Sequence, residues 1–338
     1  MKHIAAGLMA FALLGGCGGG SSNPFERNEA DEETDGGTGE GPITVDTAVV
    51  VPAALAGNVR SATFDAANGT LVVEGLNLDE VPFAATYIRT AALDRPGYQA
   101  FTIQEDPLDR HFTAFAAQSN NSGSVRAVTA GSPGPRNRSF LGGFFQRDGA
   151  FDRPQVTETT GQVSYAGTYV GVTNLGDING PNLLPIPNPG SVDPELLIPQ
   201  AQTVQGRAFI NADFADNRVE GNITGRTIAE TGQALPSLVL VATGIEANGT
   251  FNGGVEYDIR DPLSNTTDTV GIGDFGGVFG GPNSDGVAGV VNLTQFDGSG
   301  NPLGMLNELE SGIFVLDQCG AAVSSPICTN VNPDSGTP

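Results

Sequence analysis

The strongest constraint on the fold is an alternation of apolar and polar residues in two neighbouring runs, Val204–Phe214, with Phe209 as the exception, and Arg218–Arg226. A period of two places successive side chains on opposite faces, as in a β-strand with one buried face. Only Ala215-Asp216-Asn217 separates the runs, which suits a tight turn. The buried face of the second run comprises Val219, Gly221, Ile223 and Gly225. Arg226 is predicted on the opposite, polar face. Because a short turn joins the two runs, we predict that they form an antiparallel hairpin.

Similar short apolar runs, divided by Gly, Asn, Asp and Pro, continue through residues 157–318. The eight predicted strands are Gln162–Asn174, Val204–Phe214, Arg218–Arg226, Ser237–Ile245, Thr250–Asp258, Asp274–Gly281, Gly286–Leu293 and Ser311–Leu316. Glycines recur inside them, and interior glycine permits the coiling and close backbone approach of a closed barrel. We therefore predict an eight-stranded antiparallel up-and-down barrel over residues 157–318. Bulky apolar side chains must fill its middle, or a cavity remains.

Residues 44–156 have the same texture and a more balanced charge, which indicates a separate small antiparallel domain, or handle, ahead of the barrel. Its predicted strands are Asn58–Phe64, Thr70–Glu74, Ala84–Thr90, Tyr98–Gln104, Phe112–Gln118, Ser124–Thr129 and Ser139–Gln146. Asn68-Gly69 is a hairpin signal between the first two. The predicted fold class is thus all-β throughout the folded part.

A long insert, Gly176–Gln200, separates the first two barrel strands. Its prolines, among them Pro185, Pro187 and Pro189, prevent regular structure. Long loops in compact domains are often functional. The insert is therefore a predicted functional loop.

The first residues follow the pattern of an export signal. A short positive start precedes an apolar run, Ile4–Leu14, that is too short to span a bilayer. The next residues, Leu14-Gly15-Gly16-Cys17, resemble the lipobox of bacterial lipoproteins. This resemblance implies that residues 1–16 are a removed signal peptide and that Cys17 is lipidated. An ordinary signal peptide with an incidental cysteine is the alternative.

The resemblance also implies a place in the cell. Residue 18 is Gly rather than Asp, so the inner-membrane retention signal is missing and we expect an outer-membrane, cell-surface protein. Residues 17–43 are rich in Gly, Ser and acids and cannot bury a core, which predicts an extended tether. Membrane attachment is expected through the lipid.

Two cysteines remain, Cys319 and Cys328. An exported protein meets an oxidising environment, so we predict that they form a disulfide in a C-terminal tail, residues 319–338. A metal pair is less favoured, because two thiols alone make a poor zinc site.

The run Gly273–Pro282 and the strand after it resemble a known barrel signature. The residues of this chain that carry the signature are Gly276, Gly277, Phe279, Gly281, Pro282 and Gly289. In this respect the chain resembles a lobe of transferrin-binding protein B, a family of surface lipoproteins with a handle and a barrel. Gly280 stands where the family has tyrosine, and there is one lobe rather than two. The resemblance implies the fold and a role in binding, not transferrin as the partner.

Several kinds of chemistry are disfavoured by the residue inventory. Lys2 is the only lysine, and 38 acids face 15 basic residues, so neither a lysine-based mechanism nor nucleic-acid binding is expected. Beyond the signal, His111 is the only histidine, and no nucleophile elbow is present, so we expect no enzyme. No cofactor or metal is predicted. His111, Tyr165 and Tyr169 are the residue types that ligate haem iron, although core or surface roles are favoured.

Two further motifs have alternative readings. Asp297–Asn301 alternates oxygen side chains as calcium loops do, but a plain turn is favoured because the closing Glu is missing. A locally basic stretch combines arginine with aromatic residues, a composition typical of binding hot spots. The predicted partner-contact residues are Arg136, Arg138, Phe140, Phe144 and Arg147. Solvated arginines beside core phenylalanines are the alternative.

Together these features predict a non-enzymatic outer-membrane lipoprotein that binds a ligand or partner protein. A haem or iron carrier is the expected ligand class, in line with iron or haem acquisition. A structural or adhesive envelope lipoprotein without a small-molecule ligand is the alternative.

Overall fold

The computed structural model describes residues 49–76, 82–156, 161–257, 271–294 and 307–329, all within one compact unit that spans residues 45–338. Cys17 and the predicted signal and tether lie outside the described residues. Over the described ranges the chain is almost entirely β-structure, and no helix there has the length and apolar character needed to cross a membrane. The single α-helix within these ranges is the short α1 (Ala53–Ala56), which the sequence pattern did not predict.

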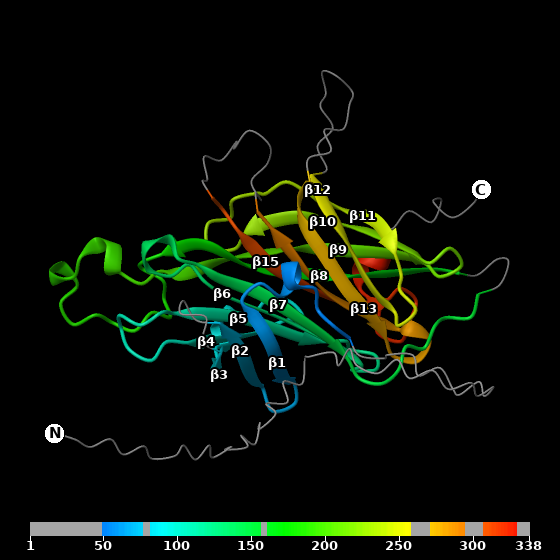
Figure 1. Cartoon of the computed structure of the whole chain (residues 1–338), viewed down its shortest axis with the longest axis horizontal. Coiled ribbons are helices and arrows are strands. Elements are labelled where there is room, and N and C mark those ends of the chain that lie inside the picture. The colour runs from blue at the N-terminus through cyan, green and yellow to red at the C-terminus, as the bar shows by residue number, and fades with distance from the viewer. Residues whose placement is uncertain (1–48, 77–81, 157–160, 258–270, 295–306, 330–338) are drawn as a thin grey trace, which may run out of the picture. The chain divides into compact units, whose positions relative to one another are not determined.

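The first seven strands form one antiparallel sheet in sequential order, β1 to β7 (Figure 1). They are β1 (Val59–Asp65), β2 (Thr70–Leu76), β3 (Pro82–Arg89), β4 (Gln99–Ile103), β5 (Phe112–Gln118), β6 (Val125–Ser132) and β7 (Phe140–Arg147). The sheet curls so that its ends approach: Asn58, just before β1, donates its backbone N–H to the carbonyl of Leu141 on β7 at 2.9 Å. Its concave side holds an aromatic core. These strands fall where the sequence predicts them.

The other eight strands close into an antiparallel barrel, as predicted. They are β8 (Gln162–Asp177), β9 (Gln200–Asp213), β10 (Arg218–Ile228), β11 (Leu238–Gly244), β12 (Thr250–Tyr257), β13 (Gly271–Gly280), β14 (Gly286–Leu293) and β15 (Glu310–Gln318). Each strand pairs with the next in sequence, and β15 pairs with β8 to complete the cylinder. Two short 3₁₀ helices, Pro189–Ser191 and Pro194–Leu196, interrupt the long insert between β8 and β9.

Bulky side chains fill the middle of the barrel. The buried aromatic residues of this core are Tyr165, Tyr169, Phe214, Phe251, Tyr257, Phe275, Phe279 and Phe314. The rings of Phe251 and Phe214 lie 5.0 and 5.1 Å from that of Phe279. Small residues on the walls therefore leave room that large rings occupy.

One prediction about the barrel was wrong. Arg226 points into the barrel and its side chain has no solvent exposure, although the alternation placed it on the polar face. The cause is a register shift in the pairing of β10 with β9 between Thr224 and Thr227, where Gly225 adopts a left-handed conformation with φ of 60°. An extra residue in one strand of a pair reverses the faces of the residues that follow.

Inside the barrel Arg226 meets Glu310 on β15. The Arg226 Nη2 and Glu310 Oε2 atoms are 2.5 Å apart, and both side chains are fully buried. The Tyr169 hydroxyl donates a hydrogen bond to the other Glu310 oxygen at 2.6 Å. Burial, followed by the Glu310 charge, raises the pKa of Tyr169 well above its usual value. The core thus contains one charged, hydrogen-bonded network among aromatic rings.

The curled sheet packs on the outer wall of the barrel. The shared core joins Phe115 and Phe145 of the sheet to Val278, Val290 and Ile313 of the barrel. This explains why β13 and β14 read as nearly continuous apolar runs rather than alternating ones. One face of these strands lines the barrel interior, and the other lies beneath the sheet.

Tyr98, which directly precedes β4, inserts its hydroxyl into the barrel wall. The hydroxyl donates to the Thr168 carbonyl at 2.6 Å and accepts from the Val315 N–H at 3.1 Å. The pairing of β15 with β8 runs to Phe314 opposite Tyr169 and resumes at Asp317 opposite Ala166. The hydroxyl therefore satisfies backbone groups where the strand pairing is interrupted.

The predicted barrel motif lies in the β13–β14 hairpin. Phe279 belongs to the aromatic core, and Gly281 begins the turn with φ of 79°, which disfavours any other residue. A Cβ atom on Gly276 would come within 2.6 Å of the Leu55 side chain, so this glycine lets α1 pack on the barrel. Pro282 opens a 3₁₀ turn, Gly277 faces Gly289 across the hairpin, and the motif is thus structural.

The predicted disulfide between Cys319 and Cys328 is present. The loop that it closes attaches to the sheet, because the Asn121 side chain exchanges two hydrogen bonds with the backbone of Val323. Asn120 and Asn121 also donate to the Asp317 carboxylate next to the disulfide. We call residues 319–328 the C-terminal strap, since they join β15 to the turn between β5 and β6.

Candidate functional site

Three loops meet at one end of the described unit (Figure 1). They are the β4–β5 loop, residues 104–111; the β6–β7 loop, residues 133–139; and the insert between β8 and β9, residues 178–199. Two belong to the sheet and one to the barrel. They come together because β5 and β6 pack against β8 and β9. We call this group of loops the loop end.

Gln104 joins the β4–β5 loop to the insert. Its side-chain oxygen accepts the backbone N–H of Leu184 at 2.8 Å, while its amide nitrogen donates to the Asp109 carbonyl at 2.9 Å. On the other side of the insert, the Gln200 side-chain oxygen accepts the N–H of Asn182 at 2.9 Å. Two glutamine side chains thus hold a loop whose only regular elements within the described residues are two short 3₁₀ helices.

Arg110 joins the β4–β5 loop to the β6–β7 loop. Its guanidinium donates to the Arg138 carbonyl at 2.6 Å and lies 6.0 Å from the centre of the Phe112 ring. The 3₁₀ turn Pro135–Asn137 contacts the 3₁₀ turn Pro194–Leu196 of the insert. The three loops are therefore joined to one another by side-chain and backbone contacts and form one surface.

This surface exposes large apolar side chains from two of its loops. The exposed fractions are 50% for Leu108, 54% for Ile178, 37% for Leu184 and 41% for Leu196. Single exposed apolar residues are common, but a group of them on neighbouring loops is typical of protein interaction sites. Asp193 caps the turn that carries Leu196 by accepting the Glu195 N–H. Prolines further restrict the insert, so less conformational entropy is lost on binding.

The predicted partner-contact residues are only partly exposed together. Arg136 and Arg138 are exposed at the loop end, and Phe144 is half-buried on β7. Phe140 is buried and makes an edge-on contact with the Phe112 ring at 5.0 Å. Arg147 is buried too, and donates to the carbonyls of Asn248 and Phe279 at 2.8 and 2.9 Å. The structure therefore brings two of the five to the loop end and places Arg147 at the contact between sheet and barrel.

The residues considered for haem are all buried. Burial lowers the pKa of His111 to about 4, and its exposed fraction is 1%. The Tyr165 hydroxyl donates to the Ser284 carbonyl at 2.7 Å, and that of Tyr169 to Glu310. Burial raises the pKa of both phenols, which disfavours the phenolate needed to bind iron. A haem ligand would reach these atoms only if the core opened.

No three His, Cys, Asp or Glu side chains gather closely enough to hold a metal ion in the part of the chain that the structure describes. The turn Asp297–Asn301 lies outside the described residues. The exposed apolar side chains of the loop end carried no signal in the sequence that set them apart from core residues. The insert itself could be recognised by its length and prolines.

Comparison with known proteins gives matches at the level of structure. No protein-family model matches the chain, and no curated protein matches it either. Among solved structures, a transferrin-binding protein B double mutant from Haemophilus parasuis Hp5 is 12% identical, with a TM-score of 0.36, over 74% of this chain and 51% of that one. The isotype 1 protein from serogroup B Neisseria meningitidis is 14% identical, with a TM-score of 0.33, over 74% and 49%.

A further match, a mutant of the same protein from Actinobacillus pleuropneumoniae H49, is 13% identical with a TM-score of 0.33, over 78% of this chain and 97% of that one. The chain spans about half the length of the first two structures. All three are structures of transferrin-binding protein B.

Proposed function

We propose that this protein is a non-enzymatic, lipid-anchored outer-membrane protein that binds a partner protein through the loop end. The observation that supports this most is the set of exposed apolar side chains, Leu108, Ile178, Leu184 and Leu196, on interlocked loops. Burying such side chains against a partner gains roughly 1.5–3 kcal/mol each when burial is complete. Arg136 and Arg138 beside them supply donors for the edge of the contact.

The core also supports binding at the surface rather than in the barrel. Aromatic rings and the Arg226–Glu310 pair occupy the barrel interior. A ligand would have to displace well-packed side chains to enter, whereas the loop end is already exposed.

The partner test uses immobilised full chain and two probes taken from the expected iron or haem role, iron-loaded transferrin and a haem-carrying protein. The loop-end variants are Ile178→Asp and Leu196→Asp. The matched control is Ile88→Asp on β3, which alters a more exposed apolar residue, 68%, outside the loop end. Binding measured by surface plasmon resonance is expected to weaken at least tenfold, about 1.4 kcal/mol, in both loop-end variants and to persist in the control.

The same variants serve when neither probe binds. Proteins captured by the wild type and by Ile88→Asp from host serum are compared with those captured by the loop-end variants. A protein retained by the first two and lost by the last two supports the proposal. Equal capture by all four chains would remove the loop end as the binding site.

The anchor is tested separately. Labelling of cells with a clickable palmitate analogue is expected to mark the wild type and not Cys17→Ser. Protease treatment of intact cells is expected to cleave the anchored protein if it faces outward. A protected protein would place it on the periplasmic side and contradict surface display.

A further inference from the structure

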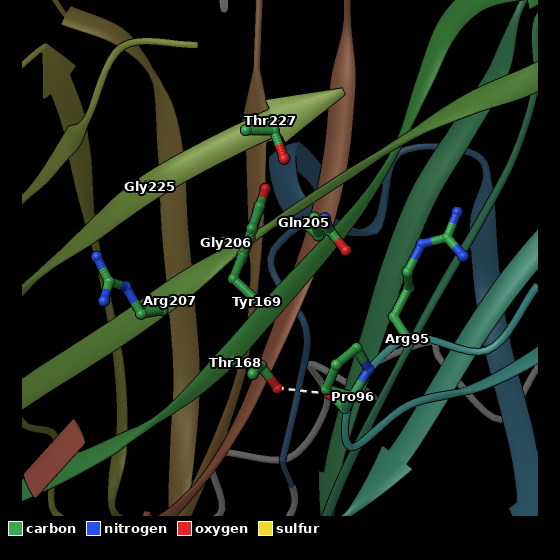
Figure 2. A pocket seen from close by; sticks show the side chains of 9 residues that line it. All are labelled: Arg95, Pro96, Thr168, Tyr169, Gln205, Gly206, Arg207, Gly225 and Thr227. Atoms are coloured by element: carbon green, nitrogen blue, oxygen red, sulfur yellow. Dashed lines mark hydrogen bonds between the residues drawn. The ribbon is translucent and has the colours of Figure 1, made fainter. Parts of the chain in front are cut away.

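A pocket of about 330 Å³ lies between the turn before β4 and the outer wall of the barrel (Figure 2). It is separate from the loop end. The lining residues are Arg95 and Pro96 of the turn, Thr168 and Tyr169 of β8, Gln205, Gly206 and Arg207 of β9, and Gly225 and Thr227 of β10. Its volume lies at the lower end of the range for small-molecule sites, and sites often form where two parts of a fold meet.

The charge of this pocket is opposite to that of the chain. Its lining includes two arginines and no acid, although the chain has 38 acids and 15 basic residues. Arg95 is paired with Glu230 beside the pocket, so Arg207 supplies the net positive charge. Other hollows follow the general charge: one is lined by Asp317, and another by Glu220 and Glu256. Positive charge concentrated in one hollow of an acidic protein favours an anion there.

The two arginines have different roles. Arg95 and Arg207 lie on opposite sides of the pocket, with Gln205 and Thr227 between them (Figure 2). The Arg95 Nη2 atom is fixed by Thr203 at 2.9 Å and by Glu230 at 3.2 Å. Arg207 is exposed and has neither a hydrogen bond nor an ion pair among the residues that the structure describes. Arg207 therefore has its charge and its donors available to a ligand.

The floor of the pocket results from the β-bulge that turns Arg226 inward. Gly225 lies at the register shift of β10 against β9 and has no side chain to fill the hollow; a Cβ atom there would come within 3.4 Å of the Arg207 Nη2 atom. Gly206 lines the pocket with its backbone only, since a Cβ atom on it would point into the barrel, within 3.2 Å of the Arg226 side chain. Bulges often occur beside functional sites, where they redirect side chains.

We propose that this pocket binds a small hydroxylated carboxylic acid, with the carboxylate on Arg207 and hydroxyl groups on Gln205 and Thr227. A guanidinium matches a carboxylate through two parallel hydrogen bonds. The amide of Gln205 and the hydroxyl of Thr227 each donate and accept, which suits hydroxyl groups. The Thr168 hydroxyl donates to the Pro96 carbonyl at 2.7 Å and thus fixes the turn against the barrel wall.

The test is titration of the full chain by isothermal calorimetry with three probes: glucuronate, which has a carboxylate and hydroxyls; glucose, which has hydroxyls alone; and inorganic phosphate, which has charge without the carbon-bound hydroxyls. The wild type is expected to bind glucuronate at least tenfold more tightly than glucose or phosphate. Arg207→Gln is expected to weaken glucuronate binding at least tenfold.

Arg218→Gln is the matched control, because it removes the same charge from an exposed position on β10 outside the pocket. It is expected to bind glucuronate as the wild type does. Equal losses in both variants, or no glucuronate binding by the wild type, would overturn the site. Phosphate bound as tightly as glucuronate would overturn the assignment of Gln205 and Thr227. Unchanged melting temperatures of the two variants establish that folding is intact.

Discussion

The charged network in the barrel core gives a sharp quantitative prediction. Replacing Arg226 by Met leaves the Glu310 carboxylate buried without its cation, and Glu310→Met leaves the guanidinium without its anion. Both side chains have zero exposure, so water cannot take over either role. Removing one partner of a buried pair typically costs about 3–5 kcal/mol, and we expect each single variant to lose that amount of unfolding free energy.

The double variant Arg226→Met/Glu310→Met distinguishes the pair from its separate parts. It leaves no buried charge, and its main defect is the Tyr169 hydroxyl, which loses its acceptor at a cost of about 1–3 kcal/mol. The double variant is therefore expected to be more stable than either single one. The coupling energy between the two positions should exceed about 3 kcal/mol.

Urea unfolding followed by circular dichroism and tyrosine fluorescence measures these values, and the absence of tryptophan leaves the tyrosine signal unobscured. Glu310→Gln is a useful comparison, because the amide oxygen still accepts from Tyr169. A double variant whose loss equals the sum of the single losses would refute the reasoning. So would a single-variant loss below about 1 kcal/mol, because water would then have to reach the pair.

Three further outcomes are expected. Tyr98→Phe should lower the unfolding free energy by about 3 kcal/mol in urea titrations, since a buried N–H and a buried carbonyl lose their shared partner. The pKa of His111 falls from 6.5 to about 4 on folding. The buried, neutral imidazole therefore makes its full contribution to the free energy of unfolding above pH 6.5, and this contribution is lost as the pH falls toward 4. The stability gap between the wild type and His111→Leu should therefore change by about 3 kcal/mol between pH 7 and 4, and a constant gap would contradict this. Reduction of the Cys319–Cys328 disulfide should cost about 2 kcal/mol, measured as a lower urea midpoint with dithiothreitol, and Cys319→Ser should then be insensitive to the reductant.

The strands could be predicted from sequence because their information is local. Alternation and turn residues located β9 and β10 and the tight turn between them, and glycine-led runs located the β13–β14 hairpin. The prediction of faces was wrong after Gly225, because a single left-handed glycine shifts the register and no local pattern marks it. The polar appearance of Arg226 gave no sign of its buried partner, which lies far away in the sequence.

The candidate site depends even more on distant contacts. The insert and the exposed Arg136 and Arg138 could be identified from composition. Their meeting with the β4–β5 loop depends on how the sheet packs against the barrel, which residues such as Gln104 do not reveal locally. Local composition likewise predicts that Arg147 contacts a partner, because it cannot reveal the packing of the sheet on the barrel. In the structure the Arg147 guanidinium donates to carbonyl groups of the barrel.

The last strand, β15, closes the barrel and contributes to several other parts of the fold. It pairs with both β14 and β8, supplies Glu310 to the core, and leads into the C-terminal strap. Until it is in place, β14 and β8 have unpaired edges, and β14 is apolar on both faces. Such edges are templates for aggregation, and pairing between distant segments is slow. We therefore expect a chain of this protein that lacks its final strand to be prone to aggregation.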